Sequence, residues 1–147
     1  MSDQILAPNT ISRNNGAQSY RDLLVWQKGM ALAKEIYKIT SGLPAEEKFG
    51  LISQMRRARV SVPSNIAEGQ ARNTTGEFVQ FISHAEGSLA ELDTQLTLAV
   101  ELNFLLLERA KFCMDSIAEL RRMLNGLRRA VTGQKPSARQ SSPVTRH

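Results

Sequence analysis

The clearest indication of the fold lies in residues 106–131, LLERAKFCMDSIAELRRMLNGLRRAV. Apolar residues recur in this segment at alternating intervals of three and four positions, namely Ala110, Cys113, Ile117, Leu120, Leu124, Leu127 and Val131. This heptad spacing places all seven on one side of an α-helix. The segment therefore predicts a long amphipathic helix that buries one stripe against neighbouring helices.

Three earlier segments show the same helical periodicity. Residues 20–40 follow Ser19, which can cap a helix, and residues 75–102 follow Thr74, which can do the same. Between them, the segment 44–73 begins with Pro44, a residue favoured at the first position of a helix. Four amphipathic helices joined by short turns predict an all-α, antiparallel up-down-up-down four-helix bundle.

Pro63 lies in the middle of the second of these segments. A proline inside a helix lacks one N–H donor, frees the carbonyl of Arg59 and costs about 3 kcal/mol. We therefore expect the helix to kink or restart there, with Ser61 able to cap the restarted part.

The segments outside the predicted bundle carry no apolar period. Residues 1–18 are rich in Asn, Ser, Gln and Gly, and residues 132–147 are similar but basic. We expect a disordered N-terminal tail at 1–18, a bundle domain at 19–131 and a disordered basic C-terminal tail at 132–147.

Composition excludes several classes of protein. The chain has 147 residues, of which 41% are hydrophobic and 22% charged, values typical of a soluble globule. It holds no apolar run of the roughly 18 to 20 residues that span a membrane, and its start lacks the features of a signal peptide, so we expect a cytoplasmic protein. The single Cys113 and the two histidines argue against a disulfide and a metal site. Phosphate-binding glycine motifs are also absent, so we expect no cofactor and no small-molecule substrate.

The positive charge is concentrated at the C-terminal end. Residues 1–104 carry 10 Lys or Arg and 11 Asp or Glu, whereas residues 105–147 carry 9 and 3. Within the second part, two arginine pairs seven residues apart share one side of the predicted helix, Arg121 with Arg122 and Arg128 with Arg129. Because Arg binds phosphate in a bidentate manner, these four are candidates for RNA phosphate binding. The alternative interpretation is an ordinary solvated charged face.

Two polar rows form a second set of candidate residues. The first row lies on segment 44–73 and comprises Gln54, Arg57, Ser61, Ser64, Asn65 and Glu68. Because Ser and Asn are poor residues for a helix interior, we favour a buried hydrogen-bonded contact, within the subunit or between subunits, over a solvated face. The second row has heptad spacing and predicts self-association through a second seam; its members are His84, Ser88, Glu91, Gln95, Leu98 and Leu102.

A Ser-His-acid device is conceivable in the second row, since His84, Ser88 and Glu91 belong to it. Nucleophilic catalysis needs a convergent pocket with an oxyanion site, and three residues stacked along one helix do not supply it. We therefore expect a protein that is not an enzyme.

Four stretches of the sequence resemble a known family. They are YRDLLVWQKGMALAKEIY at 20–37, FGLISQMRRARVSVPSNIAEGQAR at 49–72, EFVQFISHAEGSLAELDTQL at 77–96 and MLNGLRRAV at 123–131. Together they are similar to the bacterial four-helix bundle family related to proteins encoded in 23S rRNA intervening sequences. The resemblance covers about residues 20–131, and the chain departs from it at Arg59, where a small apolar residue is expected.

The resemblance implies a small bundle that assembles as a ring, commonly a homopentamer, without known enzymatic activity. It also implies binding of ribosomal or other RNA through a basic surface. The family's signature positions fall largely on the two polar rows, at Gln54, Arg57, Ser61, Pro63, Asn65, Glu68, Gly69, Ser88 and Glu91. The leading hypothesis is thus a homo-oligomeric RNA-binding bundle, and the alternative is a protein-interaction scaffold with no nucleic-acid role.

Overall fold

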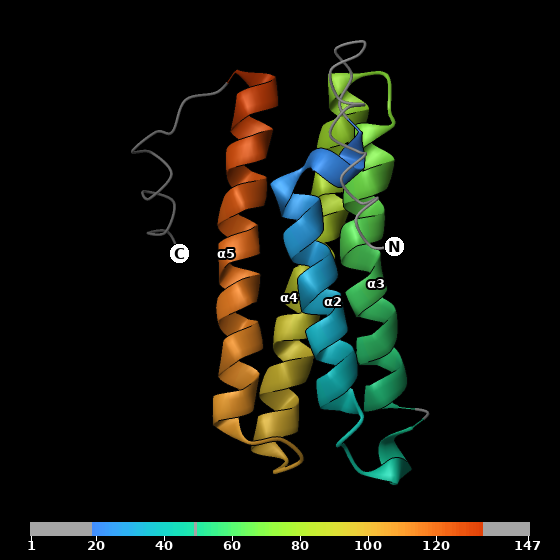
Figure 1. Ribbon diagram of the computed structural model, residues 1–147, viewed down its shortest axis with the longest axis vertical. Coiled ribbons are helices and arrows are strands. Elements are labelled where there is room, and N and C mark those ends of the chain that lie inside the picture. Colours follow the sequence, from blue (N-terminus) through green and yellow to red (C-terminus); the bar gives the residue numbers. More distant parts are fainter. Residues whose placement is uncertain (1–18, 49, 134–147) are drawn as a thin grey trace, which may run out of the picture.

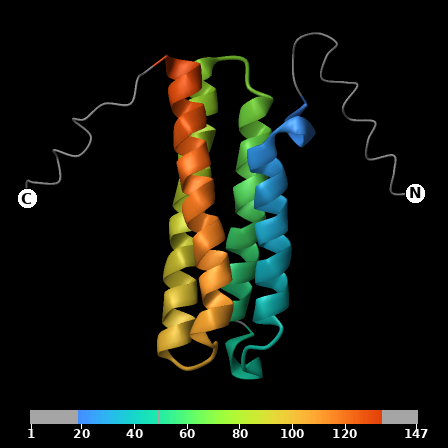
Figure 2. The same cartoon turned by 60° about the vertical axis from the view of Figure 1, so that its left-hand side comes forward.

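The computed structural model describes residues 19–48 and 50–133. These residues form two 3₁₀ turns and four long helices, η2 (Tyr20–Asp22), α2 (Leu24–Thr40), η3 (Ala45–Glu47), α3 (Leu51–Gln70), α4 (Thr75–Glu101) and α5 (Leu107–Thr132). Successive helices run in opposite directions (Figures 1 and 2). The predicted all-α, up-down-up-down four-helix bundle is confirmed. The predicted tail at 1–18 lies outside the described residues, as does most of the tail predicted at 132–147, whose first two residues are the last residue of α5 and its cap, Thr132 and Gly133.

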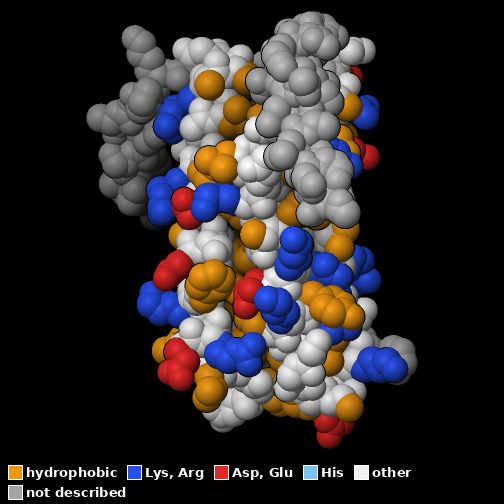
Figure 3. Space-filling model, in the orientation of Figure 1, with side chains coloured by type: hydrophobic (Ala, Val, Ile, Leu, Met, Phe, Trp, Pro, Cys, Tyr) orange, Lys and Arg blue, Asp and Glu red, His pale blue; other side chains and the backbone are white. Residues whose placement is uncertain are grey.

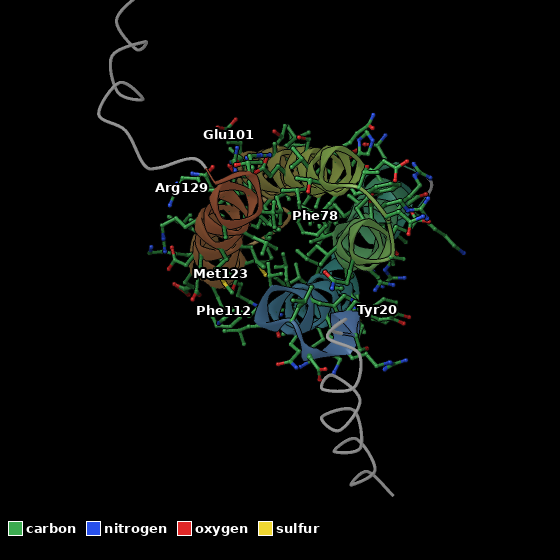
Figure 4. The ribbon with its side chains drawn as sticks, turned by 90° about the horizontal axis from the view of Figure 1, so that it is seen from above. Tyr20, Phe78, Glu101, Phe112, Met123 and Arg129 are labelled. Atoms are coloured by element: carbon green, nitrogen blue, oxygen red, sulfur yellow. The ribbon has the colours of Figure 1, made fainter. Side chains whose placement is uncertain are left out.

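The four helices surround one apolar core in chain order, so that α2 lies beside both α3 and α5 (Figure 4). The pair formed by α3 and α4 has the most extensive contact. Every helix contributes fully buried side chains, the largest being Ile36, Ile39, Met55, Val62, Ile66, Ile82, Leu89, Leu92, Leu96, Ile117, Leu120 and Leu124. Their burial explains why the apolar stripes of the sequence are sufficient to specify a bundle.

The first helix begins later than its sequence pattern predicts. Ser19 does act as a cap, since its Oγ accepts a hydrogen bond from the Arg21 N–H at 3.2 Å, but it caps only the turn η2. Leu23 then adopts an extended backbone conformation, and α2 starts at Leu24. The prediction of one continuous helix over 20–40 was therefore wrong in its first turn.

The second helix also begins later than predicted. Pro44 precedes the short turn η3 and does not occupy the first position of α3, which starts at Leu51. The carboxylate of Glu47 accepts a hydrogen bond from the Leu51 N–H at 3.3 Å. An acidic side chain thus stabilises the N-terminus of α3 from the preceding turn.

Pro63 does not divide α3, which is continuous over Leu51–Gln70, and Ser61 does not cap a new helix. Pro63 is buried against α2, where Gly29 permits close approach: a Cβ added at Gly29 would lie 3.7 Å from the Cα of Pro63. The packing of α2 against the proline offsets the missing hydrogen bond.

The last two helices follow their predicted bounds closely. Thr74 caps α4 by accepting a hydrogen bond from the Glu77 N–H at 3.1 Å. Helix α5 ends at Thr132 and is followed by Gly133 in the left-handed conformation, with φ of 78°. Of the predicted α5 stripe, Leu127 is only partly buried and Val131 is exposed, because α2 begins at Leu24 and leaves the last turn of α5 uncovered.

Candidate nucleic-acid interface

The four arginines predicted on α5 differ in their exposure. Arg121 and Arg122 are exposed, whereas Arg128 and Arg129 are partly buried. Arg129 lies on the outer side of α5, away from the bundle axis (Figure 4). Among the described residues, Arg121, Arg122 and Arg129 have no carboxylate partner. These three guanidinium groups are therefore free to contact an anion.

Arg128 has a different role, because it is bound to Glu86 of α4. Its NH2 lies 2.6 Å from Glu86 Oε1 and its NH1 lies 3.1 Å from Oε2, so the pair is bidentate. The two side chains are only 23% and 26% exposed, and Ser83 Oγ accepts a further hydrogen bond at 3.3 Å. The Glu86 carboxylate neutralises Arg128, which connects α5 to α4 and contributes little to a phosphate-binding surface.

The two predicted polar rows meet where α3 packs on α4. The hydroxyls of Ser61 and Ser88 lie 2.7 Å apart, and Asn65 Nδ2 donates to the Ser61 Oγ at 2.9 Å and to the Ser61 carbonyl at 2.8 Å. Ser88 is buried, while Ser61 and Asn65 are partly buried. The three side chains form a hydrogen-bonded cluster within the subunit.

The remaining members of the rows are not part of this cluster. On α3, Gln54, Arg57 and Glu68 are exposed, and on α4 Glu91 is exposed and accepts a hydrogen bond from Gln95 Nε2 at 3.5 Å. Gln95 is buried, and its Oε1 has no hydrogen-bond partner among the described residues.

The close packing of α3 on α4 depends on small residues. Gly69 near the end of α3 faces Phe81 of α4, and a Cβ added to this glycine would lie 3.0 Å from the Cβ of Phe81. Together with the serine pair, Gly69 lets the two helices approach closely. The small residues in this part of the sequence therefore have a packing role.

The residues considered for a catalytic device do not contact each other in the required way. The Ser88 hydroxyl lies against the Ser61 hydroxyl and 3.3 Å from the backbone carbonyl of His84, to which it donates. The His84 imidazole packs edge-on against the Phe81 ring, with 5.7 Å between the ring centroids. In residues 19–48 and 50–133, no group of three or more His, Cys, Asp or Glu side chains is arranged to hold a metal ion.

A second basic surface, which the sequence analysis missed, lies over α2 and α3. Two of its arginines contact the Tyr37 ring: the guanidinium carbons of Arg56 and Arg59 lie 4.0 Å and 4.9 Å from its centroid. Arg56 is fixed there because its Nε donates to Thr40 Oγ1 at 2.8 Å. Lys and Arg side chains gather over the middle of this face (Figure 3).

The same surface continues along a groove between α2 and α3. The groove is lined by Tyr20, Trp26, Met30, Ala33, Lys34, Arg59, Val60, Pro63, Ser64 and Ala67. At its upper end the Arg21 guanidinium lies 5.7 Å from the Trp26 ring. The net charge summed over residues 1–104 gave no indication of this surface, because acidic residues elsewhere on the bundle cancel its positive charge in the sum. The helical spacing of Trp26, Met30, Ala33 and Tyr37 could have indicated it.

None of the helices in the described part of the chain is both long and apolar enough to cross a membrane. In sequence, the model of the family described as 23S rRNA-intervening sequence protein matches residues 21–126. No curated protein matches the chain.

In structure, the chain is similar to a protein of unknown function from the S23 ribosomal protein family of Bacteroides thetaiotaomicron, solved by crystallography. The TM-score is 0.67 at 21% sequence identity, over 71% of this chain and 98% of the other. At that identity the similarity concerns the fold.

Proposed function

Because the chain belongs to the 23S rRNA-intervening sequence protein family, we propose that it is a cytoplasmic, non-enzymatic homo-oligomer that binds ribosomal or other RNA through phosphate contacts. The observation that carries the proposal is a set of three arginines on α5, of which Arg121 and Arg122 are exposed and Arg129 is partly buried. Arg121, Arg122 and Arg129 have no carboxylate partner among the described residues, so phosphate can take that place. These contacts carry no sequence information, so the binding is directed by RNA shape and charge.

Exposed apolar side chains support self-association. In the second polar row, Leu98 and Leu102 are 45% and 49% exposed although they lie on a long, well-packed helix. The neighbouring loop and the start of α5 expose Leu106 and Leu107 as well. Exposed leucines that lie together are typical of a surface covered in an assembly. A pentameric ring, as the family resemblance implies, would repeat the basic surface around an axis and strengthen its field.

Fluorescence anisotropy with a labelled, structured RNA tests the RNA-binding part of the proposal. We expect binding at low salt that weakens steeply as salt rises, because bound phosphates release counterions. No measurable binding at low salt would refute the proposed function.

The triple substitution of Arg121, Arg122 and Arg129 by Gln tests the assignment of the surface. We expect the triple variant to fold normally and to bind the structured RNA at least tenfold more weakly at the same salt concentration. The matched control is Lys111→Gln, which removes an exposed charge already paired with Asp115 at 3.3 Å on the same helix. Equal affinity of the triple variant and the wild type would exclude these arginines.

A protein-interaction scaffold is the second candidate function. The edge between α2 and α5 exposes Leu24 and Phe112, and a shallow apolar groove lined by Leu23, Leu24, Val25, Met123 and Leu127 lies on the same side. Affinity capture with and without nuclease distinguishes the two functions. Partners bridged by RNA are lost after nuclease treatment, whereas partners held by this apolar edge remain.

A further inference from the structure

We infer that the groove between α2 and α3 binds an unpaired RNA base, with the adjoining phosphate held by Lys34 and Arg59. The inference rests on the proposed function, since it specifies the RNA as single-stranded at this site. It concerns a surface separate from the arginines of α5. The two assignments can therefore fail independently.

The floor of the groove is apolar and aromatic. Trp26, Met30 and Ala33 come from α2, and Val60 and Pro63 come from α3. Val60 is 47% exposed although it lies in the middle of a helix that packs against two others. The groove has a volume of about 340 Å³, at the small end of the range for ligand sites, which suits one flat base better than a folded segment of protein.

The rim of the groove supplies two cationic hydrogen-bond donors, Lys34 and Arg59. Arg59 Nε is buried yet has no hydrogen-bond partner among the described residues. An unsatisfied buried donor is costly, and a small movement of the Arg59 side chain toward a phosphate or base oxygen in the groove would satisfy it. Lys34 lies on the same rim and has no carboxylate partner in the described chain. The chemistry of the rim therefore favours an anionic ligand with oxygen acceptors.

An aromatic ring with arginine beside it lines the groove, and a second ring lies further along α2 in contact with Arg59 of the groove. Trp26 has Arg21 over its ring, and Tyr37 has Arg56 and Arg59 over its ring. The two aromatic residues are eleven positions apart on α2, or about 16 Å along the helix axis. Aromatic rings alternating with cations along a groove are the arrangement that proteins use for single-stranded nucleic acid.

The distribution of acidic residues distinguishes this groove from the one between α2 and α5. None of the described residues that line it carries a carboxylate. By contrast, the groove between α2 and α5 is lined by Glu35 and Glu119, the second of which pairs with Lys28 at 3.4 Å. The α2–α3 groove, with Lys34 and Arg59 in its lining and no carboxylate, therefore has a charge that complements a polyanion.

Trp26 makes the inference directly testable, because it is the only tryptophan of the chain. A base that stacks on its ring will quench its fluorescence, whereas a polyanion without bases will not. We expect a single-stranded oligoadenylate of eight nucleotides to quench the full-length protein in a saturable way. Inorganic polyphosphate of similar charge should leave the intensity unchanged, even where it competes for the arginines of α5.

Two substitutions place the binding in the groove. Arg59→Gln removes the unpartnered donor, and Val60→Glu adds a negative charge on the exposed floor; each should weaken the quenching titration about tenfold. Lys111→Gln, which removes one charge on α5 outside the groove, should leave it unchanged. Circular dichroism confirms that the variants keep their helices. If either groove variant unfolds, the conservative substitutions Arg59→Lys and Val60→Thr replace it. These should also weaken the quenching titration, by less than tenfold.

The outcomes separate this inference from the proposed function. If structured RNA binds but oligoadenylate neither quenches Trp26 nor depends on Arg59, the groove assignment is overturned and the proposed function stands. If oligoadenylate quenches Trp26 while structured RNA binds independently of the α5 arginines, the groove assignment stands. Quenching by oligoglutamate but not by oligoadenylate would overturn the inference in favour of an acidic protein partner.

Discussion

Arg128 and Glu86 hold α5 against α4 through two parallel hydrogen bonds, at 2.6 Å and 3.1 Å. Because both side chains are about three-quarters buried, removing one leaves the other charge poorly solvated. We expect Arg128→Ala to lower the free energy of unfolding by roughly 1 to 3 kcal/mol. Urea denaturation followed by circular dichroism measures this loss.

Arg122 is the matched control for that experiment. It is exposed on the same helix and has no carboxylate partner in the described residues, so Arg122→Ala should change stability by less than about 0.5 kcal/mol. Equal stability of the two variants would show that the ion pair with Glu86 contributes nothing.

Cys113 is completely buried in the α5 stripe, and burial raises the pKa of its thiol from 9.0 to about 11, with a smaller contribution from Glu35. The unfolded chain releases the thiol proton near pH 9, whereas the native protein holds it until about pH 11. The stability that this neutral thiol contributes is therefore present below pH 9 and is lost as the pH rises from 9 to 11.

The variant Cys113→Ala isolates this effect. We expect the stability of the wild type to fall more steeply than that of the variant between pH 9 and pH 11, when both are unfolded by urea. Parallel pH profiles would mean that the thiol titrates alike in the native and unfolded states.

Individual site residues were predictable where a residue type was unusual for its position. Ser61 and Asn65 are poor helix formers, and the structure gives them hydrogen bonds that satisfy their polar groups. The bond between Arg128 and Glu86 was not predictable, because the pairing of α4 with α5 in space decides which residues face each other. The contact of Arg56 with Tyr37 depends in the same way on the pairing of α2 with α3.

At the level of helices, the apolar stripe of α5 predicts which residues of that helix stabilise the bundle. Leu120 is almost completely buried among the four helices, so Leu120→Ala should cost roughly 2 to 5 kcal/mol through lost burial and the cavity left behind. Phe112 lies on the same helix but is 61% exposed, and Phe112→Ala should cost far less. Thermal or urea unfolding that ranked Phe112→Ala as the more damaging change would show that the stripe is misplaced.

The contact between α3 and α4 makes a second prediction at this scale. A methyl group at Gly69 meets the Cβ of Phe81 at 3.0 Å, and this atom cannot rotate away, so Gly69→Ala should push the helices apart and cost roughly 1 to 3 kcal/mol. Gly87 lies exposed within α4 with nothing within 4 Å of an added Cβ. There the same substitution should stabilise the protein by about 0.5 to 1 kcal/mol.

The two glycine variants are compared by urea unfolding under identical conditions. Opposite signs are expected for one chemical change, because packing decides the first and backbone entropy the second. Stabilisation by both substitutions would show that α3 and α4 do not approach as closely at Gly69 as the structure has them.

The helices themselves were predictable because their apolar residues recur every three or four positions, whereas their starts were less so. The break at Leu23 carries no glycine or proline, so the local sequence gave no signal for it, whereas Gly50 directly precedes the start of α3 at Leu51. Pro63 predicted a break in α3, but the helix is continuous there because α2 packs closely against the proline at Gly29.

At the scale of the whole molecule, charge on the bundle is organised by face. The sequence correctly predicted an excess of positively charged residues on α5. Of its second arginine pair, however, Arg128 is paired with Glu86. The basic surface over α2 and α3 belongs to a part of the chain whose overall charge is slightly negative. Only the folded arrangement separates these cations from the carboxylates that cancel them in the sum (Figure 3).

Several copies of this bundle are expected to bind RNA together, and sedimentation equilibrium of the full chain with a structured RNA measures both the assembly and the binding. For a pentamer, five chains of 16.3 kDa give a protein mass of about 82 kDa. At low salt the RNA absorbance should sediment with a species of that mass plus the mass of the RNA, and at high salt it should separate from the protein. Sedimentation of the protein as a single chain of 16.3 kDa, with the RNA remaining free at low salt, would contradict the account.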